Sequence, residues 1–136
     1  LRAVLTVMKP QGSGVIVNTA SMAAIKGAAT LSPYIASKHA VLGLTKSAAL
    51  EGAPHGIRVN CVAPGHIDTR MARDLTAQIN PDDPEGTYRA VSATVPLYQR
   101  YGTAAEVANV VLWLLSDESE YVSGAIHLID GALNAG

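Results

Sequence analysis

The side chains best able to do chemistry in this sequence are Ser21, Tyr34 and Lys38. Tyr34 and Lys38 stand four positions apart, so a helix places them on one face, one turn from each other. Ser21 closes an apolar, β-branched stretch, residues 15–21, that is typical of a buried strand. A hydroxyl, a phenol and an ammonium are therefore predicted to converge, although a Tyr–Lys pair alone is more often part of an exposed helix face.

The chemistry predicted for this set is proton transfer near neutral pH. A tyrosine phenol has a pKa near 10, so working near pH 7 requires that pKa to fall by roughly 3, or about 4 kcal/mol. One ammonium at about 4 Å supplies about 4 kcal/mol where the effective dielectric constant is near 20. Ser21 would donate a hydrogen bond to a substrate oxygen as charge develops there. The predicted reaction is hydride transfer between nicotinamide and a carbonyl or secondary alcohol, with Tyr34 moving the proton.

Strands and helices alternate along the chain, and this alternation predicts where these side chains lie. The predicted strands are residues 15–21, 57–63 and 125–129, and the main predicted helices are residues 33–51 and 103–116. Apolar strands in such an order are typical of an α/β fold, a Rossmann-like parallel sheet with flanking helices. Ligands of these sheets bind beyond the carboxyl ends of the strands. The loops after Ala20, Ala63 and Ile129 are therefore expected to form one functional edge.

Local signals mark several element boundaries. Ser32 before Pro33 predicts an N-cap for the long helix. Thr103 and Glu106 have the spacing of a capping box. Residues 69–95 contain a cluster of helix breakers between two short helical pieces, and they are expected to form a mobile insert.

Composition limits the class of protein. The 136 residues are 49% apolar and 15% charged with a net charge of −1, which fits one folded domain without the basic excess of a nucleic-acid binder. No apolar run approaches the roughly 18 residues of a membrane span. The lone Cys61 fits a reducing, cytoplasmic compartment, and the histidines have no metal-ligand spacing. We expect a small-molecule substrate, with no metal and with no nucleic-acid or membrane partner.

Four segments carry a specific pattern: Val15–Ser21, Tyr34–Ala40, Arg58–Thr69 and Asp117–Gly131. Their order and spacing resemble the C-terminal half of the short-chain dehydrogenase/reductase family across nearly the whole chain. The resemblance implies a Rossmann-like fold, NAD or NADP as cofactor, and interconversion of a secondary alcohol and a ketone. Within the family the sequence is most similar to reductases that act on cyclic ketones or diketones.

The resemblance also implies a role for each matching residue. Ser21 would bind and polarise the substrate oxygen, Tyr34 would act as acid and base, and Lys38 would lower the tyrosine pKa and hold the nicotinamide ribose. The cofactor-binding set would be Tyr34, Lys38, Pro64, Gly65, Ile67 and Thr69. Of these, Ile67 would act through its backbone and Thr69 through its side chain.

Two further features follow from the same resemblance. Residues 69–95 match the family's substrate lid, whose variability hides the identity of the substrate. The long helix would build a homodimer or homotetramer interface, since a stripe of small residues allows close packing. The stripe consists of Ala36, Ala40, Gly43 and Ser47.

Two departures from the family pattern are visible. The Gly-x-Gly at Gly12–Gly14 precedes a strand, so it is expected to be a helix-to-strand turn and not a phosphate-binding loop. Asp130–Ala132 reads Asp-Gly-Ala where the family commonly has Asp-Gly-Gly. The first departure leaves the sequence without a phosphate-binding motif, and the second puts the geometry of the terminal turn in doubt.

Residues 1–8 predict the second half of a helix that has no start signal. We therefore interpret residues 1–136 as the C-terminal catalytic portion of a single dehydrogenase domain whose N-terminal cofactor-binding half is missing. The isolated polypeptide is then expected to be inactive. Two alternatives stay open: an inactive α/β module that only oligomerises, and a 3-oxoacyl-acyl-carrier-protein reductase.

Overall fold

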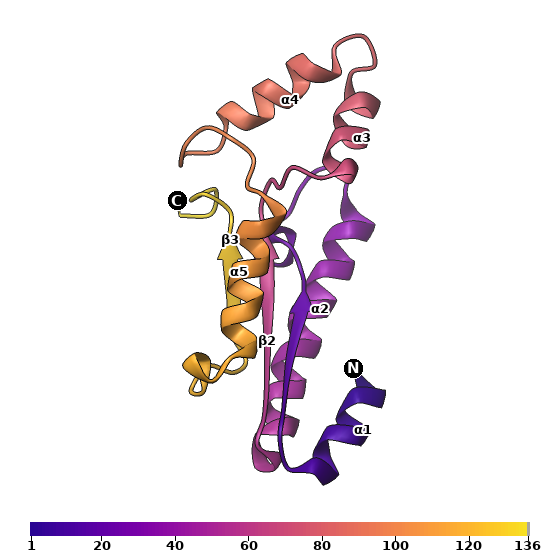
Figure 1. The fold of residues 1–136 in the computed structure, drawn as a ribbon. Helices are drawn as coiled ribbons and strands as arrows, with labels where there is room; N and C mark the ends of the chain where they lie inside the picture. Colours follow the sequence, from indigo (N-terminus) through magenta and orange to yellow (C-terminus); the bar gives the residue numbers. More distant parts are fainter. Residues whose placement is uncertain (136) are drawn as a thin grey trace.

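The computed structural model describes residues 1–135. Helices and strands follow one another in the predicted order (Figure 1): α1 (Arg2–Gln11), β1 (Gly14–Thr19), the short 3-10 helix η1 (Met22–Ala24), α2 (Ser32–Gly52), η2 (Ala53–His55), β2 (Ile57–Pro64), α3 (Arg70–Ile79), α4 (Pro84–Ala93), α5 (Ala104–Leu115), η3 (Asp117–Ser119) and β3 (Ile126–Ile129). The two helical pieces predicted within residues 69–95 are α3 and α4. The predicted fold class, a Rossmann-like parallel sheet with flanking helices, is confirmed.

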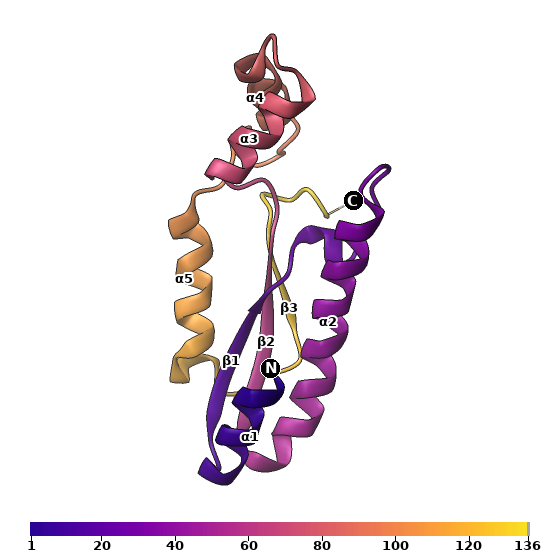
Figure 2. The same ribbon diagram turned by 90° about the vertical axis from the view of Figure 1, so that its right-hand side faces the viewer.

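The sheet of the described residues has the order β1-β2-β3, and both pairs of neighbouring strands run parallel. At their carboxyl ends Thr19 lies opposite Val62, and Pro64 lies opposite Ile129. Helices α1 and α2 cover one face of the sheet, and α5 covers the other (Figure 2). All three strands therefore end at one edge, and Figure 2 shows α3 and α4 beyond that same edge.

The central strand β2 supplies much of the core. Side chains alternate between the two faces of a strand, and Val59 and Cys61 both face α2 with no exposed surface. Cys61 packs with Ala20 and Ala24, two buried residues on either side of Ser21. This cluster holds in place the segment that carries Ser21.

Two polar side chains of β2, Arg58 and Asn60, are satisfied by backbone groups. The Arg58 guanidinium donates hydrogen bonds to the carbonyl oxygens of Leu114 at 3.1 Å and Ser116 at 3.0 Å. Carbonyls at the end of a helix lack partners within it and attract positive charge. Asn60 Nδ2 donates to the Val122 carbonyl at 2.7 Å. These bonds attach the end of α5 and the following loop to β2.

The N-cap prediction for α2 is wrong. The Ile35 N–H donates to the Leu31 carbonyl at 2.9 Å, so the helix begins one residue earlier than predicted. Ser32 is therefore the first helical residue, and Leu31 is the cap without a side-chain hydrogen bond.

The terminal turn contains Ala132 in a left-handed backbone conformation, with φ at 71°. This region favours glycine, and an alanine there costs about 1 kcal/mol. The Asp130 carboxylate accepts hydrogen bonds from the backbone N–H of Ala132 at 3.0 Å and of Asn134 at 3.1 Å. These two bonds hold the turn in spite of the alanine.

The capping box predicted for α5 is confirmed. Thr103 Oγ1 accepts a hydrogen bond from Glu106 N at 3.1 Å, and the Glu106 carboxylate accepts one from Thr103 N at 2.7 Å. Arg100 Nη2 donates to the same carboxylate at 2.6 Å. Hydrogen bonds from Arg100 and Thr103 lower the pKa of Glu106 from its ordinary 4.5 to about 2.

We expect Glu106→Gln to lower the melting temperature near pH 7, because glutamine keeps the capping geometry and loses the ionic part. A carboxyl group whose pKa is lower in the folded state than in the unfolded state stabilises the protein at pH values above the unfolded-state pKa. For Glu106 this stabilisation is lost as the pH falls from about 5 to about 2. Thermal unfolding of both proteins across this range should show the two melting temperatures converging. A difference that stays constant with pH would contradict the assignment.

Candidate active site

Tyr34 and Lys38 lie close together near the start of α2, as their spacing predicts. Lys38 Nζ lies 5.6 Å from the centroid of the Tyr34 ring. The same ammonium donates a long hydrogen bond of 3.5 Å to the carbonyl oxygen of Thr19, the last residue of β1. Tyr34 is 42% exposed, so its phenol is accessible from solvent. The structure thus places an accessible phenol and an ammonium at the carboxyl end of β1.

Ser21 lies two residues beyond β1, where the chain turns into η1. Its Oγ accepts a hydrogen bond from Ala23 N at 3.2 Å and caps η1. A hydroxyl that accepts through its oxygen keeps its proton free to donate. Among the described residues, Ser21 forms no hydrogen bond with Tyr34 or Lys38. The three residues share one edge of the sheet without forming a hydrogen-bonded chain.

The loop after β2 carries the other residues expected to contact a cofactor. Gly65 N donates to the Ile129 carbonyl at 3.0 Å, which holds the loop against the end of β3. Thr69 Oγ1 accepts a hydrogen bond from Ala72 N at 3.3 Å and caps α3. The loop is therefore fixed at both ends, by the sheet and by a helix.

Ile67 lies opposite Gly102 in a parallel β-bridge. The hydrogen bonds of this bridge are made by the residues on either side of Ile67. Asp68 N donates to the Gly102 carbonyl at 2.8 Å, and Gly102 N donates to the His66 carbonyl at 2.9 Å. None of the residues 1–135 hydrogen-bonds the N–H or the carbonyl of Ile67 itself. Ile67 is half-buried, so this donor and acceptor are available to water or to a ligand.

Sequence reasoning missed an arginine beside this loop. Arg73 donates from Nε and Nη2 to the two carboxylate oxygens of Asp68, at 3.0 and 3.2 Å. These hydrogen bonds hold the pKa of Asp68 below its ordinary value. A spacing of five residues is not one of the helical spacings that bring side chains together. The pair forms only because α3 begins after Thr69.

Three other features bear on the kind of site that residues 1–135 can form. Residues 1–135 hold no group of three or more His, Cys, Asp or Glu side chains arranged for a metal ion. None of their helices combines the length and the apolar character needed to cross a membrane. Cys61 is completely buried and burial raises the pKa of its thiol, so it is not placed as a nucleophile.

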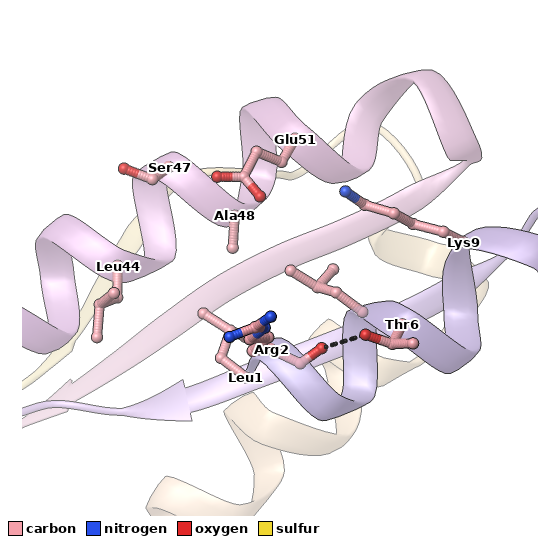
Figure 3. Close-up of a pocket in the computed structure, with 9 residues that line it drawn as sticks. Leu1, Arg2, Thr6, Lys9, Leu44, Ser47, Ala48 and Glu51 are labelled. Carbon is pink, nitrogen blue, oxygen red and sulfur yellow. Dashed lines mark hydrogen bonds between the residues drawn. The ribbon is translucent and has the colours of Figure 1, made fainter.

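A cleft of about 370 Å³ lies between α1 and α2 (Figure 3). Its α2 residues run from Leu44 to Glu51, in the C-terminal half of the helix, whereas Tyr34 lies in the first turn. The cleft is therefore near the amino ends of the strands, and ligands of parallel α/β sheets bind at the carboxyl ends. We do not assign it to the candidate active site.

Comparison with known proteins identifies the family. A family model described as "Enoyl-(Acyl carrier protein) reductase" matches residues 1–134. Levodione reductase from Leifsonia aquatica is 43% identical over 135 residues, which cover 99% of this chain and 50% of that protein. The chain belongs to the short-chain dehydrogenase/reductase family. It spans about half the length of the curated relatives it matches.

Solved structures share the fold. The crystal structure of levodione reductase matches with a TM-score of 0.96 at 43% identity, covering 100% of this chain and 52% of that one. NAD+-bound xylitol dehydrogenase matches with a TM-score of 0.86 at 37% identity, covering 96% and 53%. L-sorbose reductase from Gluconobacter frateurii, complexed with NADPH and L-sorbose, matches with a TM-score of 0.91 at 27% identity, covering 99% and 52%.

We expect Gly65→Ala to destabilise the protein by about 1–3 kcal/mol, because overpacking of this kind forces the backbone to move. A Cβ at Gly65 would lie 2.8 Å from Asp130 Cβ and 2.9 Å from Asp130 Cα. Gly27→Ala is the matched control, since nothing lies within 4 Å of a Cβ there. Urea unfolding midpoints measure the effect, and equal losses for both variants would refute the close approach.

Proposed function

We propose that this chain supplies the catalytic site of an NAD(P)-dependent oxidoreductase that interconverts a secondary alcohol and a ketone. The observation that carries the proposal is the position of Lys38 Nζ, between the Tyr34 ring and the Thr19 carbonyl. Membership of the family supports the class of reaction. In this proposal residues 1–136 are the C-terminal catalytic portion of a single Rossmann-like domain, and residues 69–95 are its substrate lid.

Tyr34 moves the proton in this proposal. Its phenol donates a proton to the carbonyl oxygen during reduction and accepts one from the alcohol during oxidation. Negative charge develops on the phenol oxygen as the proton leaves, and the Lys38 ammonium stabilises that charge. The Thr19 carbonyl keeps the ammonium at the end of β1.

Ser21 orients the substrate. Its oxygen accepts the Ala23 N–H, so its own proton is free to hydrogen-bond the substrate oxygen. This bond strengthens as negative charge develops on that oxygen during hydride addition. The buried cluster around Ala20 and Ala24 fixes the hydroxyl before the substrate arrives, so little reorganisation is needed during the reaction.

The loop after β2 fits a nicotinamide carboxamide. The unpaired N–H and carbonyl of Ile67 match the acceptor and the donor of a primary amide. Pro64, Gly65 and Thr69 belong to this loop, and Tyr34 and Lys38 would hold the ribose. NADH or NADPH, when bound, would supply the hydride for ketone reduction, and NAD+ or NADP+ would accept it during alcohol oxidation. The similarity to levodione reductase supports a cyclic ketone or diketone as substrate.

The test uses the full-length protein that carries this chain, with levodione as carbonyl probe and NADH and NADPH as reductants. We expect Tyr34→Phe to lower kcat at least about 100-fold, the usual contribution of general acid–base catalysis. Binding of NADH, followed by nicotinamide fluorescence, should weaken far less than kcat falls, because the other proposed cofactor contacts remain. Tyr121→Phe is the matched control, because Tyr121 is fully exposed.

Lys38→Met should lower kcat as well and should also weaken NADH binding, because Lys38 acts on both the phenol and the ribose in this proposal. A Tyr34→Phe enzyme as active as the Tyr121→Phe enzyme would refute the proposed site. Wild-type protein inactive on ketones with either reductant would favour the non-catalytic alternative.

We also propose a homodimer or homotetramer built on α2. The stripe of Ala36, Ala40, Gly43 and Ser47 is exposed in the single chain. The neighbouring Leu44 is 57% exposed, and a Cβ at Gly43 would meet nothing within 4 Å. An exposed apolar strip of this kind is typical of an interaction surface.

Gly43→Trp is expected to reduce the assembly to smaller species, because an indole blocks close helix packing while the folded chain has room for it. Light scattering of the full-length protein measures the mass, and Gly27→Trp in an open loop is the control. An unchanged mass for Gly43→Trp would exclude this face as the interface.

A further inference from the structure

Arg73 connects three separate parts of the chain. On α3, it binds both carboxylate oxygens of Asp68, which stands in the loop between Ile67 and Thr69. Its Nη1 donates to Glu85 Oε1 at 3.2 Å, at the start of α4. One guanidinium therefore joins the loop after β2 to both helices of residues 70–95.

The same guanidinium stacks on a pair of aromatic rings. Arg73 Cζ lies 3.8 Å from the centroid of the Tyr88 ring on α4. The Tyr88 ring in turn stacks on Tyr101, with centroids 4.1 Å apart and planes 7° from parallel. Tyr101 is only 6% exposed, and it precedes the Gly102 that bridges Ile67. We call Arg73, Tyr88 and Tyr101 the stacked column.

Tyr101, at the base of the column, is buried beside the loop after β2. Tyr101 also contacts His66 from the loop after β2, with ring centroids 5.7 Å apart. Tyr101 therefore packs against the loop that carries Ile67. The stacking of Tyr88 on Tyr101 attaches α4 to that loop. Planar stacking and two-point carboxylate binding suit arginine and not lysine.

We propose that Arg73 is a positioning residue that holds residues 70–95 closed against the cofactor loop, residues 64–69. The inference rests on the proposed function. Arg73 also separates two negative charges, those of Asp68 and Glu85, which face each other across it. Without the guanidinium, the two carboxylates repel each other and the Tyr88 ring loses its stacking partner. Helices α3 and α4 then move away from the cofactor loop.

Amide hydrogen exchange on the full-length protein tests the closure directly. Arg73→Met should speed exchange of peptides within residues 70–95 by about tenfold and leave β2 peptides unchanged, as expected for local opening. Arg70→Met is the matched control on the same helix, because the Arg70 side chain is 95% exposed and its ion pair with Asp74 spans a long 3.9 Å. Equal exchange in the two variants would overturn the proposal.

Steady-state kinetics with levodione and NADH distinguish a loss of segment positioning from a general loss of folded, active enzyme. Arg73→Met should raise KM for levodione about tenfold and change kcat less than about threefold, because a loosened lid weakens binding in the ground state and the transition state equally. Arg73→Lys should recover only part of the wild-type KM, since lysine keeps the positive charge between Asp68 and Glu85 and loses the stacking and the two-point contact. Full rescue by lysine would overturn the proposed role of the column.

Tyr88→Leu provides a second route if Arg73→Met does not fold. It removes the middle of the stacked column and leaves the Asp68–Arg73 pair intact, so exchange within residues 84–93 should accelerate more than within residues 70–79. Wild-type exchange rates in Tyr88→Leu would contradict the proposal. If the wild-type protein shows no turnover, the proposed function fails, and the exchange measurements still decide whether Arg73 closes the segment.

Discussion

The candidate site depends on β2 pairing in parallel with both β1 and β3. Parallel pairing brings the carboxyl ends of all three strands to one edge. Because β2 is central and buried, a change in its register would shift every loop at that edge. The same pairing places Gly65 against Asp130 so closely that a side chain at Gly65 has no space. The position of residues 64–69, the proposed cofactor loop, is thus set by the hydrogen bonds of the sheet.

Backbone carbonyl groups hold two cationic side chains in place, Lys38 at the carboxyl ends of the strands and Arg58 near their amino ends. Lys38 reaches the Thr19 carbonyl, and its ammonium therefore lies beside Tyr34. On the other face of the sheet, Arg58 meets the carbonyls at the end of α5. In both cases a long cationic side chain donates to backbone carbonyl oxygens, and so links a helix to the sheet.

Residues 70–95 are attached to the rest of the fold by a different kind of interaction from those that hold the sheet and α2. The sheet and α2 are held by buried apolar contacts, whereas α3 and α4 are attached through Arg73 and its partners, which are partly exposed. Exposed ion pairs are individually weak, so this segment opens at lower cost than the core. The proposed role as a substrate lid requires that property, and in the further proposal the stacked column would hold the segment closed.

The sequence by itself determined the strands, the helices, the capping box at Thr103 and the pairing of Tyr34 with Lys38. Each of these depends on residues a few positions apart, where spacing fixes geometry. Only the tertiary structure decided the Arg73 contacts, the unpaired backbone of Ile67 and the place of Leu31 as the cap of α2. Such features follow from which elements pack together, or from one hydrogen bond that shifts a helix start, and no local pattern of residue types encodes them.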